Sequence, residues 1–167
     1  MRPFVLILLT PILIAGCSRP SPDEYFQKAE IAVKESKIDE AMPLYRKIVE
    51  EYPKSDKAEA AQFILASLYQ NNEHQYQQAI DEYWKYFVMF PEAKQAPTAL
   101  FLIGFLYNNE LKNVDSAATA YRLFLEKFPS HEMALSAQFE LEHLGEDPEA
   151  ILPAGEAPNE KPTVVKR

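Results

Sequence analysis

The chain has 167 residues, of which 25 are acidic and 17 basic, so its formal charge is −8 and its isoelectric point is near 5.0. Apolar residues make up 47% of the chain, which suits one globular domain and is too high for a wholly disordered protein. The acidic balance argues against nucleic-acid binding, and the four glycines lack the spacing of a phosphate-binding loop or dinucleotide-binding turn. A single cysteine excludes an intramolecular disulfide and a cysteine-rich zinc site.

Residues 1–16 have the pattern of a secretory signal peptide. Arg2 precedes an apolar run, Phe4 to Ala15, that is short for a membrane-spanning helix of about 20 residues. The run ends in Ile14-Ala15-Gly16-Cys17, which resembles the bacterial lipobox, whose cysteine is acylated and becomes the first residue after cleavage. The resemblance implies a lipid on Cys17 and, because Ser18 follows it, an outer-membrane location facing the periplasm. The alternative is a cysteine that merely happens to follow a signal peptide.

Behind this segment, residue types recur with a fixed period of 38. Aromatic–proline pairs stand at Tyr52-Pro53, Phe90-Pro91 and Phe128-Pro129. The same offset relates other small and aromatic residues, namely Ala41, Ala79 and Ala117; Tyr45, Tyr83 and Tyr121; Ala61, Ala99 and Ala137; and Phe63, Phe101 and Phe139. Such a period indicates repeated units, each of which buries its apolar face against the next.

The spacing of apolar residues predicts two helices in each unit. In chain order, the predicted helices span residues 23–36, 39–52, 57–70, 75–90, 96–108, 114–128 and 131–144. Asp39 is the predicted N-cap of the second helix, which places Pro43 close to the helix start, and Gly145 is the predicted C-cap of the seventh helix. Left-handed asparagines are expected in the turns at 71–72 and 108–109.

The order of residues within a unit resembles the tetratricopeptide repeat. In the first unit its signature positions hold Tyr25, Ala29, Ala41, Tyr45 and Pro53. The units are longer than the usual repeat of about 34 residues, and this stretched form is similar to the repeats of bacterial envelope proteins such as BamD and the C-terminal domain of YbgF. The resemblance covers residues 23–144 and implies an all-α superhelix of about seven antiparallel helices, made of three helix-turn-helix repeats and a capping helix.

This register gives individual residues expected positions. Ala79 is expected at a close helix crossing, Glu82 on the outer face, and Glu140 and Glu142 on the polar side of the capping helix. Residues 17–22 are expected to be a lipidated tether. Residues 145–167, rich in proline and glutamate, are predicted to be a disordered tail, with a docking segment as the alternative.

No motif in the sequence supports catalysis. The three histidines are scattered, and Glu140 with His143 is only half of a di-metal helix motif, so a surface pair is expected there. The sequence has no nucleophile elbow, and the single cysteine is assigned to acylation. We therefore expect no enzyme activity, no cofactor, no metal and no small-molecule substrate.

By position, the resemblance implies a partner-binding groove along the first helices of the repeats. The candidate residues are Phe26, Phe63, Phe101, Phe105, Phe139, Asn71 and Asn109. Such a groove takes a helix or an extended peptide, and the alternative is that these phenylalanines are ordinary core. The expected partners are other envelope proteins, and the membrane through the lipid, with a role like that of BamD in outer-membrane protein assembly. A YbgF-like division adaptor, a pilotin-like secretin assembly factor and a ligand-binding lipoprotein are the alternatives.

Overall fold

The structure, a computed structural model, describes residues 19–72 and 74–146. In these residues the chain forms seven α-helices and no strand, at α1 Pro22–Lys34, α2 Ile38–Glu51, α3 Ala58–Asn71, α4 Tyr76–Met89, α5 Ala96–Asn109, α6 Val114–Lys127 and α7 Ala134–Glu142. Every helix end lies within three residues of its predicted position. The predicted signal peptide, Cys17 and the tail from residue 147 lie outside the described residues.

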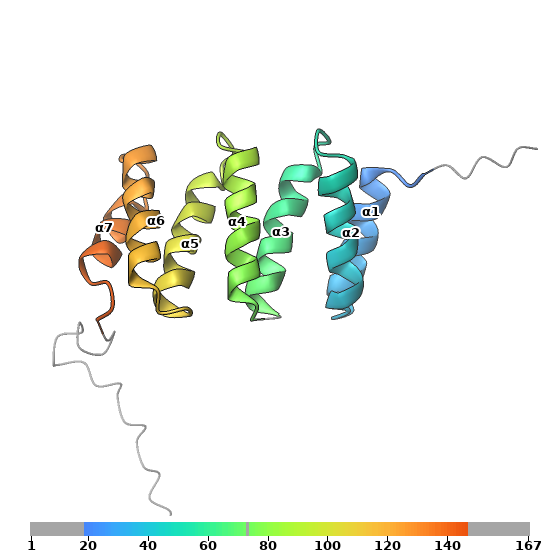
Figure 1. The fold of residues 1–167 in the computed structure, drawn as a ribbon. Helices are drawn as coiled ribbons and strands as arrows, with labels where there is room; N and C mark the ends of the chain where they lie inside the picture. The colour runs from blue at the N-terminus through green and yellow to red at the C-terminus, as the bar shows by residue number, and fades with distance from the viewer. Residues whose placement is uncertain (1–18, 73, 147–167) are drawn as a thin grey trace, which may run out of the picture.

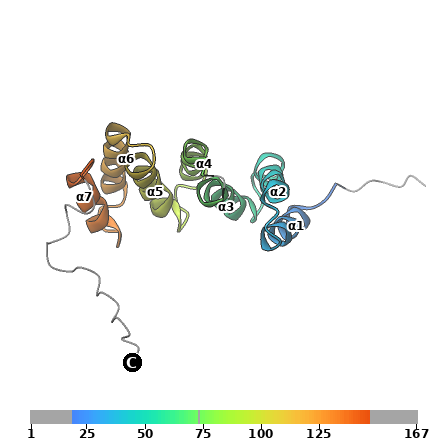
Figure 2. The same cartoon turned by 90° about the horizontal axis from the view of Figure 1, so that it is seen from below.

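Consecutive helices are antiparallel, and each packs against the next one in the chain (Figure 1). Seen along the helices, α1, α3 and α5 lie in one layer and α2, α4 and α6 in a second, while α7 continues the first layer (Figure 2). The α1–α2, α3–α4 and α5–α6 pairs are therefore three repeats in a row, closed by α7. This arrangement confirms the predicted fold class.

The residues that recur every 38 positions form the core. The alanines at the helix crossings and the tyrosines one turn later are almost completely buried, at Ala41, Ala79, Ala117, Tyr45, Tyr83 and Tyr121. A small side chain on one helix leaves room for the ring that packs beside it, which explains why these residue types alternate. The burial confirms the predicted repeat register.

Gly104 lies at a close approach of α5 to the Tyr121 ring. It occupies in α5 the position that Ala29 and Ala66 occupy in α1 and α3. A Cβ atom added to Gly104 would lie only 2.8 Å from Cε1 of the Tyr121 ring, which is closer than packed carbon atoms allow. The third repeat therefore requires glycine where the first two accept alanine.

The core consists of two clusters that meet in α3. Ala61, Leu65 and Leu68 of α3 pack with α1 and α2, whereas Ala66 packs with the buried residues of α4 to α7. Tyr69 contacts both clusters from the end of α3. Helix α3 thus packs against the first repeat with one face and against the rest of the molecule with the other.

The turns within the repeats differ from the prediction. The left-handed residues are Ser36, His74 and Lys112, with φ of 59°, 50° and 52°, and not the asparagines at 71–72 and 108–109. The helices α3 and α5 continue through Asn71 and Asn109, whose side-chain amides donate to Ser67 Oγ (3.0 Å) and the Phe105 carbonyl (3.1 Å) one turn back. The left-handed positions nevertheless keep the 38-residue period.

Two predicted helix caps are also wrong. The N-cap of α2 is Lys37, so Asp39 lies in the first turn, where its charge favours the positive end of the helix, and Pro43 is the sixth helical residue. At that position the proline removes the bond that its N–H would donate to the Asp39 carbonyl. The C-cap of α7 is His143, while Gly145, with φ 77°, follows two residues later and donates its N–H to Asn108 Oδ1 (3.3 Å).

Glu82, which the sequence analysis predicts on the outer face, is instead buried. It stands three residues after Ala79 and four before Tyr86, so it shares their inward side of α4. In α7, Glu142 is exposed and occupies the position that Gly104 has in α5. A carboxylate at this position suits a helix that packs against no further helix, and α7 is the last helix of the described residues.

Candidate functional site

The outward side of α1, α3, α5 and α7, here called the first-helix face, carries the predicted row of phenylalanines. Phe63 and Phe101 are half-buried in it. The Phe63 ring meets Tyr83 and Tyr86 edge-on at 5.4 and 5.2 Å between centroids, and Phe101 meets Tyr121 in the same way at 5.4 Å. One side of each ring is therefore core, and the other side is open to a partner.

The outer members of the row are placed differently. Phe26 is half-buried against Tyr45, with Lys57 Nζ 5.6 Å from its ring centroid. Phe139 is 48% exposed and stacks on His143 at 4.2 Å. The open ring surface is thus largest on the capping helix.

The remaining predicted residues continue the row along the middle helices. Phe101, Phe105 and Asn109 follow one another at intervals of four along α5, which places them on one side of the helix. Asn71 ends the equivalent line on α3 and is exposed, whereas Phe105 and Asn109 are half-buried. The structure therefore brings together the predicted residues of α3 and α5 as two parallel lines, with an amide at the end of each.

The first-helix face of the two middle helices is almost without charge. No residue of α5 is charged, and the single charged residue of α3 is Glu59, whose Oε1 accepts from the Tyr86 hydroxyl at 3.1 Å. Between the phenylalanines lie half-buried small and apolar side chains, at Ala60, Ile64, Thr98 and Leu102. The face is therefore suited to an apolar or uncharged protein segment, which the terminal amides could hold by its backbone.

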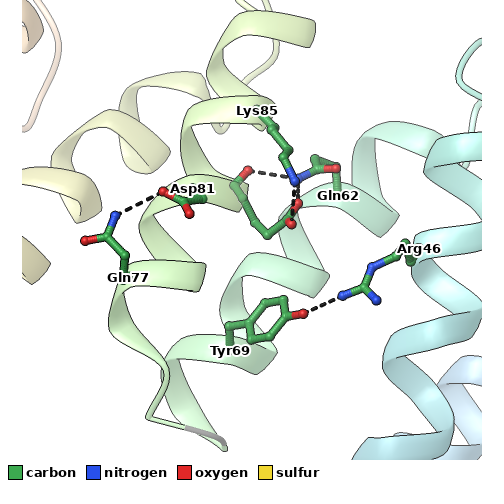
Figure 3. A network of polar contacts seen from close by, with 7 residues as sticks. Arg46, Gln62, Tyr69, Gln77, Asp81 and Lys85 are labelled. Carbon is green, nitrogen blue, oxygen red and sulfur yellow. Dashed lines mark hydrogen bonds and ion pairs between the residues drawn. The ribbon is translucent and has the colours of Figure 1, made fainter.

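A polar cluster, which the sequence analysis did not identify, lies where the first repeat meets the second (Figure 3). Gln62 Nε2 of α3 donates to Glu82 Oε2 of α4 at 2.7 Å and to the Glu82 carbonyl at 2.8 Å. The Lys85 ammonium lies 2.7 Å from the other carboxylate oxygen. Because Gln62 and Glu82 are 1% and 8% exposed, each needs the other to satisfy its polar atoms.

The same region contains a small cavity that separates α2 from α4. Its volume is about 220 Å³, and its lining includes Arg46, Gln62, Glu82 and Lys85. Arg46 of α2 donates to the Tyr69 hydroxyl of α3 (Figure 3). The contact between the first and second repeats, here called the joint, therefore contains buried polar groups and a cavity.

Comparison between repeats would have revealed the polar cluster in the sequence. In the third repeat the positions of Gln62 and Glu82 are occupied by Leu100 and Ala120, which are both buried. The signal was therefore a pair of polar residues at two positions that are apolar one repeat later.

The buried tyrosines of the second helices are held in their neutral form. Burial raises the pKa of Tyr83 and of Tyr45 to about 12, and it raises the pKa of Tyr86 and Tyr121 still more, with Glu59 and Glu140 adding to the effect. The Tyr83 hydroxyl donates to Gln70 Oε1 at 2.9 Å, whereas the buried Tyr121 hydroxyl makes no hydrogen bond. These hydroxyls serve packing and cannot act as bases near neutral pH.

Within residues 19–72 and 74–146, no three histidine, cysteine, aspartate or glutamate side chains gather as a metal site would require. In the same part of the chain, no helix has the length and apolar character to cross a bilayer.

Comparison with protein families supports the repeat assignment. The family model of the tetratricopeptide repeat matches residues 25–55 and 98–131, which comprise most of the first and third repeats. The second repeat lies between these matches and has the same helices and the same buried positions. No curated protein matches the chain. Tetratricopeptide repeats are therefore detected in these two segments, and the seven helices of the described residues have the all-α repeat fold, which is typical of scaffolds for protein–protein interaction.

Proposed function

We propose that this protein is a lipid-anchored scaffold of the bacterial periplasm, which binds an envelope protein along its first-helix face. The observation that carries the proposal is the nearly uncharged, half-buried surface of α3 and α5 around Phe63 and Phe101. In an acidic protein such a surface stands out, and aromatic rings of this kind are frequent anchors of protein interfaces.

Attachment to the membrane is supported by the sequence before the fold. A short apolar segment ends in small residues before Cys17, the one cysteine of the chain. The fold begins close behind it, because Ser21 caps α1 in a capping box with Glu24, and Pro22 is the first helical residue. A lipid on Cys17 would hold the repeats at the inner surface of the outer membrane.

The pathway we propose is outer-membrane protein assembly, in a role similar to that of BamD. The support is the stretched repeat of 38 residues with an aromatic–proline pair at each repeat end. The partner would be another envelope protein or one of its segments. The alternative adaptor roles would use the same face, so they differ from this proposal in the identity of the partner.

Anchoring is tested by Cys17→Ala in the full chain, with palmitate labelling and membrane fractionation as measurements. We expect the wild type to be labelled and to fractionate with the outer membrane, and the variant to be unlabelled and released or retained as an uncleaved precursor. Ser18→Ala is the matched control, because it leaves the cysteine in place. Equal labelling and fractionation of wild type and Cys17→Ala would refute a lipid at this residue.

A further inference from the structure

The end of α4 exposes apolar side chains on the second layer of helices, away from the first-helix face. Val88 and Met89 are 72% and 40% exposed, and Trp84 and Phe87 beside them are half-buried with ring centroids 6.0 Å apart. We refer to these four residues as the α4 patch. Exposed apolar groups that adjoin one another in this way mark an interaction site more often than isolated ones do.

A depression continues the α4 patch toward the end of α6. Its volume is about 570 Å³, and its apolar lining includes Phe87, Val88, Pro91 and Phe128. Phe87 and Phe128 meet edge-on at 6.2 Å, and Glu92 and Lys127 lie at the same depression. The apolar surface therefore extends over the ends of two neighbouring repeats.

The repeat fold does not require apolar residues at these positions. In the first and third repeats the three positions of Trp84, Val88 and Met89 carry charged side chains, namely Arg46, Glu50 and Glu51 in α2 and Arg122, Glu126 and Lys127 in α6. Helices α2 and α6, which carry these charges, bury residues at the same positions as α4 and pack in the same way. Folding alone therefore does not explain the α4 patch.

The α4 patch lies at the edge of the molecule where the chain enters the fold. Arg19 is 3.6 Å from the Glu51 carboxylate at the end of α2, and the Pro20 carbonyl accepts a hydrogen bond of 2.9 Å from the Tyr52 hydroxyl. Figure 1 shows the carboxyl ends of α2, α4 and α6 along this one edge. Because two residues span at most about 7 Å, a lipid on Cys17 would tether the fold at this edge.

We propose that the α4 patch rests on the membrane as a second contact beside the lipid anchor, a proposal that depends on lipidation of Cys17. The apolar side chains would enter the boundary between headgroups and acyl chains, as the apolar face of an interfacial helix does. The charged residues that line the two cavities beside the patch are of both signs, so the contact depends on apolar area and changes little with salt. They are Arg46, Glu50, Glu82, Lys85, Glu92 and Lys127. Two contacts on one edge fix the orientation of the superhelix, which leaves the first-helix face free for a partner.

Trp84 is the single tryptophan of the chain, so its fluorescence reports on the α4 patch alone. The mature chain from Cys17 onward is coupled through its one thiol to maleimide lipids in vesicles of phosphatidylethanolamine and phosphatidylglycerol. Part of the lipid is brominated high in the acyl chains, where bromine quenches a tryptophan at the interface. We expect stronger quenching of Trp84 in brominated than in unbrominated vesicles, at low and at high salt.

The informative variant is Val88→Glu, because glutamate is the residue that the first and third repeats carry at this position. We expect its quenching to fall to the level of uncoupled protein, with unchanged circular dichroism, since Val88 is exposed. The matched control is Ile31→Glu, which adds the same charge at an exposed residue near the opposite end of the repeat and leaves quenching unchanged.

Chemical coupling separates this proposal from the lipidation of Cys17 in cells, which palmitate labelling tests independently. If the coupled wild type shows no quenching by brominated lipid, the membrane contact is refuted even when the cell lipidates Cys17. If Trp84 is instead protected only in a concentration-dependent dimer that Val88→Glu abolishes, the patch binds a second copy of the chain and the proposal is equally refuted.

Discussion

At Gly104 the Tyr121 ring lies where the side chain of any other residue would begin. The first two repeats carry alanine at the same position, so their packing accommodates a methyl group there. Most of the repeated small residues could be predicted from the sequence, because their spacing repeats with them. The close packing at Gly104 could not be predicted, because it depends on the position of the Tyr121 ring in the folded protein.

Gly104→Ala is predicted to destabilise the protein, although the same change inside an unconstrained helix stabilises it by about 1 kcal/mol. The new Cβ would lie 2.8 Å from the ring, so the helices must separate, and overpacking of this kind costs about 1–3 kcal/mol. Urea unfolding measures the difference, with Thr98→Ala on the same helix as a control for alanine propensity. A more stable Gly104→Ala protein would mean that α5 and α6 are farther apart than described.

The buried tyrosines make stability depend on alkaline pH. The pKa of Tyr83 is raised in the folded state, so its contribution to stability is complete well below pH 10, the pKa of an unfolded tyrosine. The contribution is lost as the pH rises from there toward about 12. A pKa raised by this amount corresponds to about 3 kcal/mol for one residue. We expect the free energy of unfolding to fall steeply over this interval.

Phenylalanine variants separate ionisation from hydrogen bonding. At neutral pH, Tyr83→Phe should lower the free energy of unfolding by about 1 kcal/mol, because the hydrogen bond to Gln70 disappears. Tyr121→Phe should leave the free energy of unfolding unchanged, because the Tyr121 hydroxyl makes no hydrogen bond. Both variants should be less sensitive to alkaline pH than the wild type in urea unfolding. The same alkaline loss in wild type and both variants would show that other groups cause it.

At the scale of the helices, α3 joins two parts of the core, and it carries the buried amide that the repeat pattern does not explain. The helix bounds followed from apolar spacing, since each helix buries one side against its neighbours. The N-cap at Lys37 and the left-handed turns at Ser36, His74 and Lys112 did not follow, because these residue types have no strong preference for such positions. The prediction that Glu82 lies on the outer face is wrong, because its spacing from Ala79 and Tyr86 turns this carboxylate toward the core.

A double-mutant cycle tests whether the Gln62–Glu82 pair adds to the stability of the protein. The alternative is that each residue is needed only because the other is buried and requires a hydrogen-bond partner. Glu82→Ala alone removes the carboxylate partner of a buried amide and should cost about 1–3 kcal/mol. Gln62→Leu together with Glu82→Ala recreates the residues of the third repeat, Leu100 and Ala120, and should recover most of that loss.

The cycle is measured by urea unfolding, and Asp81→Ala serves as the control for removal of an exposed acid from α4. If the double variant is less stable than either single variant, the polar pair stabilises the joint itself. The interface would then have a different design from the apolar joint between the second and third repeats.

At the scale of the whole molecule, the superhelix presents two long surfaces with different chemistry. The first-helix face is nearly uncharged across α3 and α5, while the second layer is charged except at the α4 patch. The sequence predicted the members of the phenylalanine row, because repeated residues share a position. It could not predict how much of each ring stays open, because that depends on the angle between rings, such as Phe63 against Tyr83 and Tyr86.

Site-specific photo-crosslinking in intact cells tests the central claim that the first-helix face binds a protein partner. A photoreactive amino acid replaces Ile64 or Leu102, which lie on that face, and Gln78 or Thr119, which are exposed on the second layer of helices, serve as matched controls. We predict one adduct of the same mass from both first-helix positions and none from the controls. Adducts from the controls alone, or no adduct from Ile64 and Leu102, would contradict the proposed binding face.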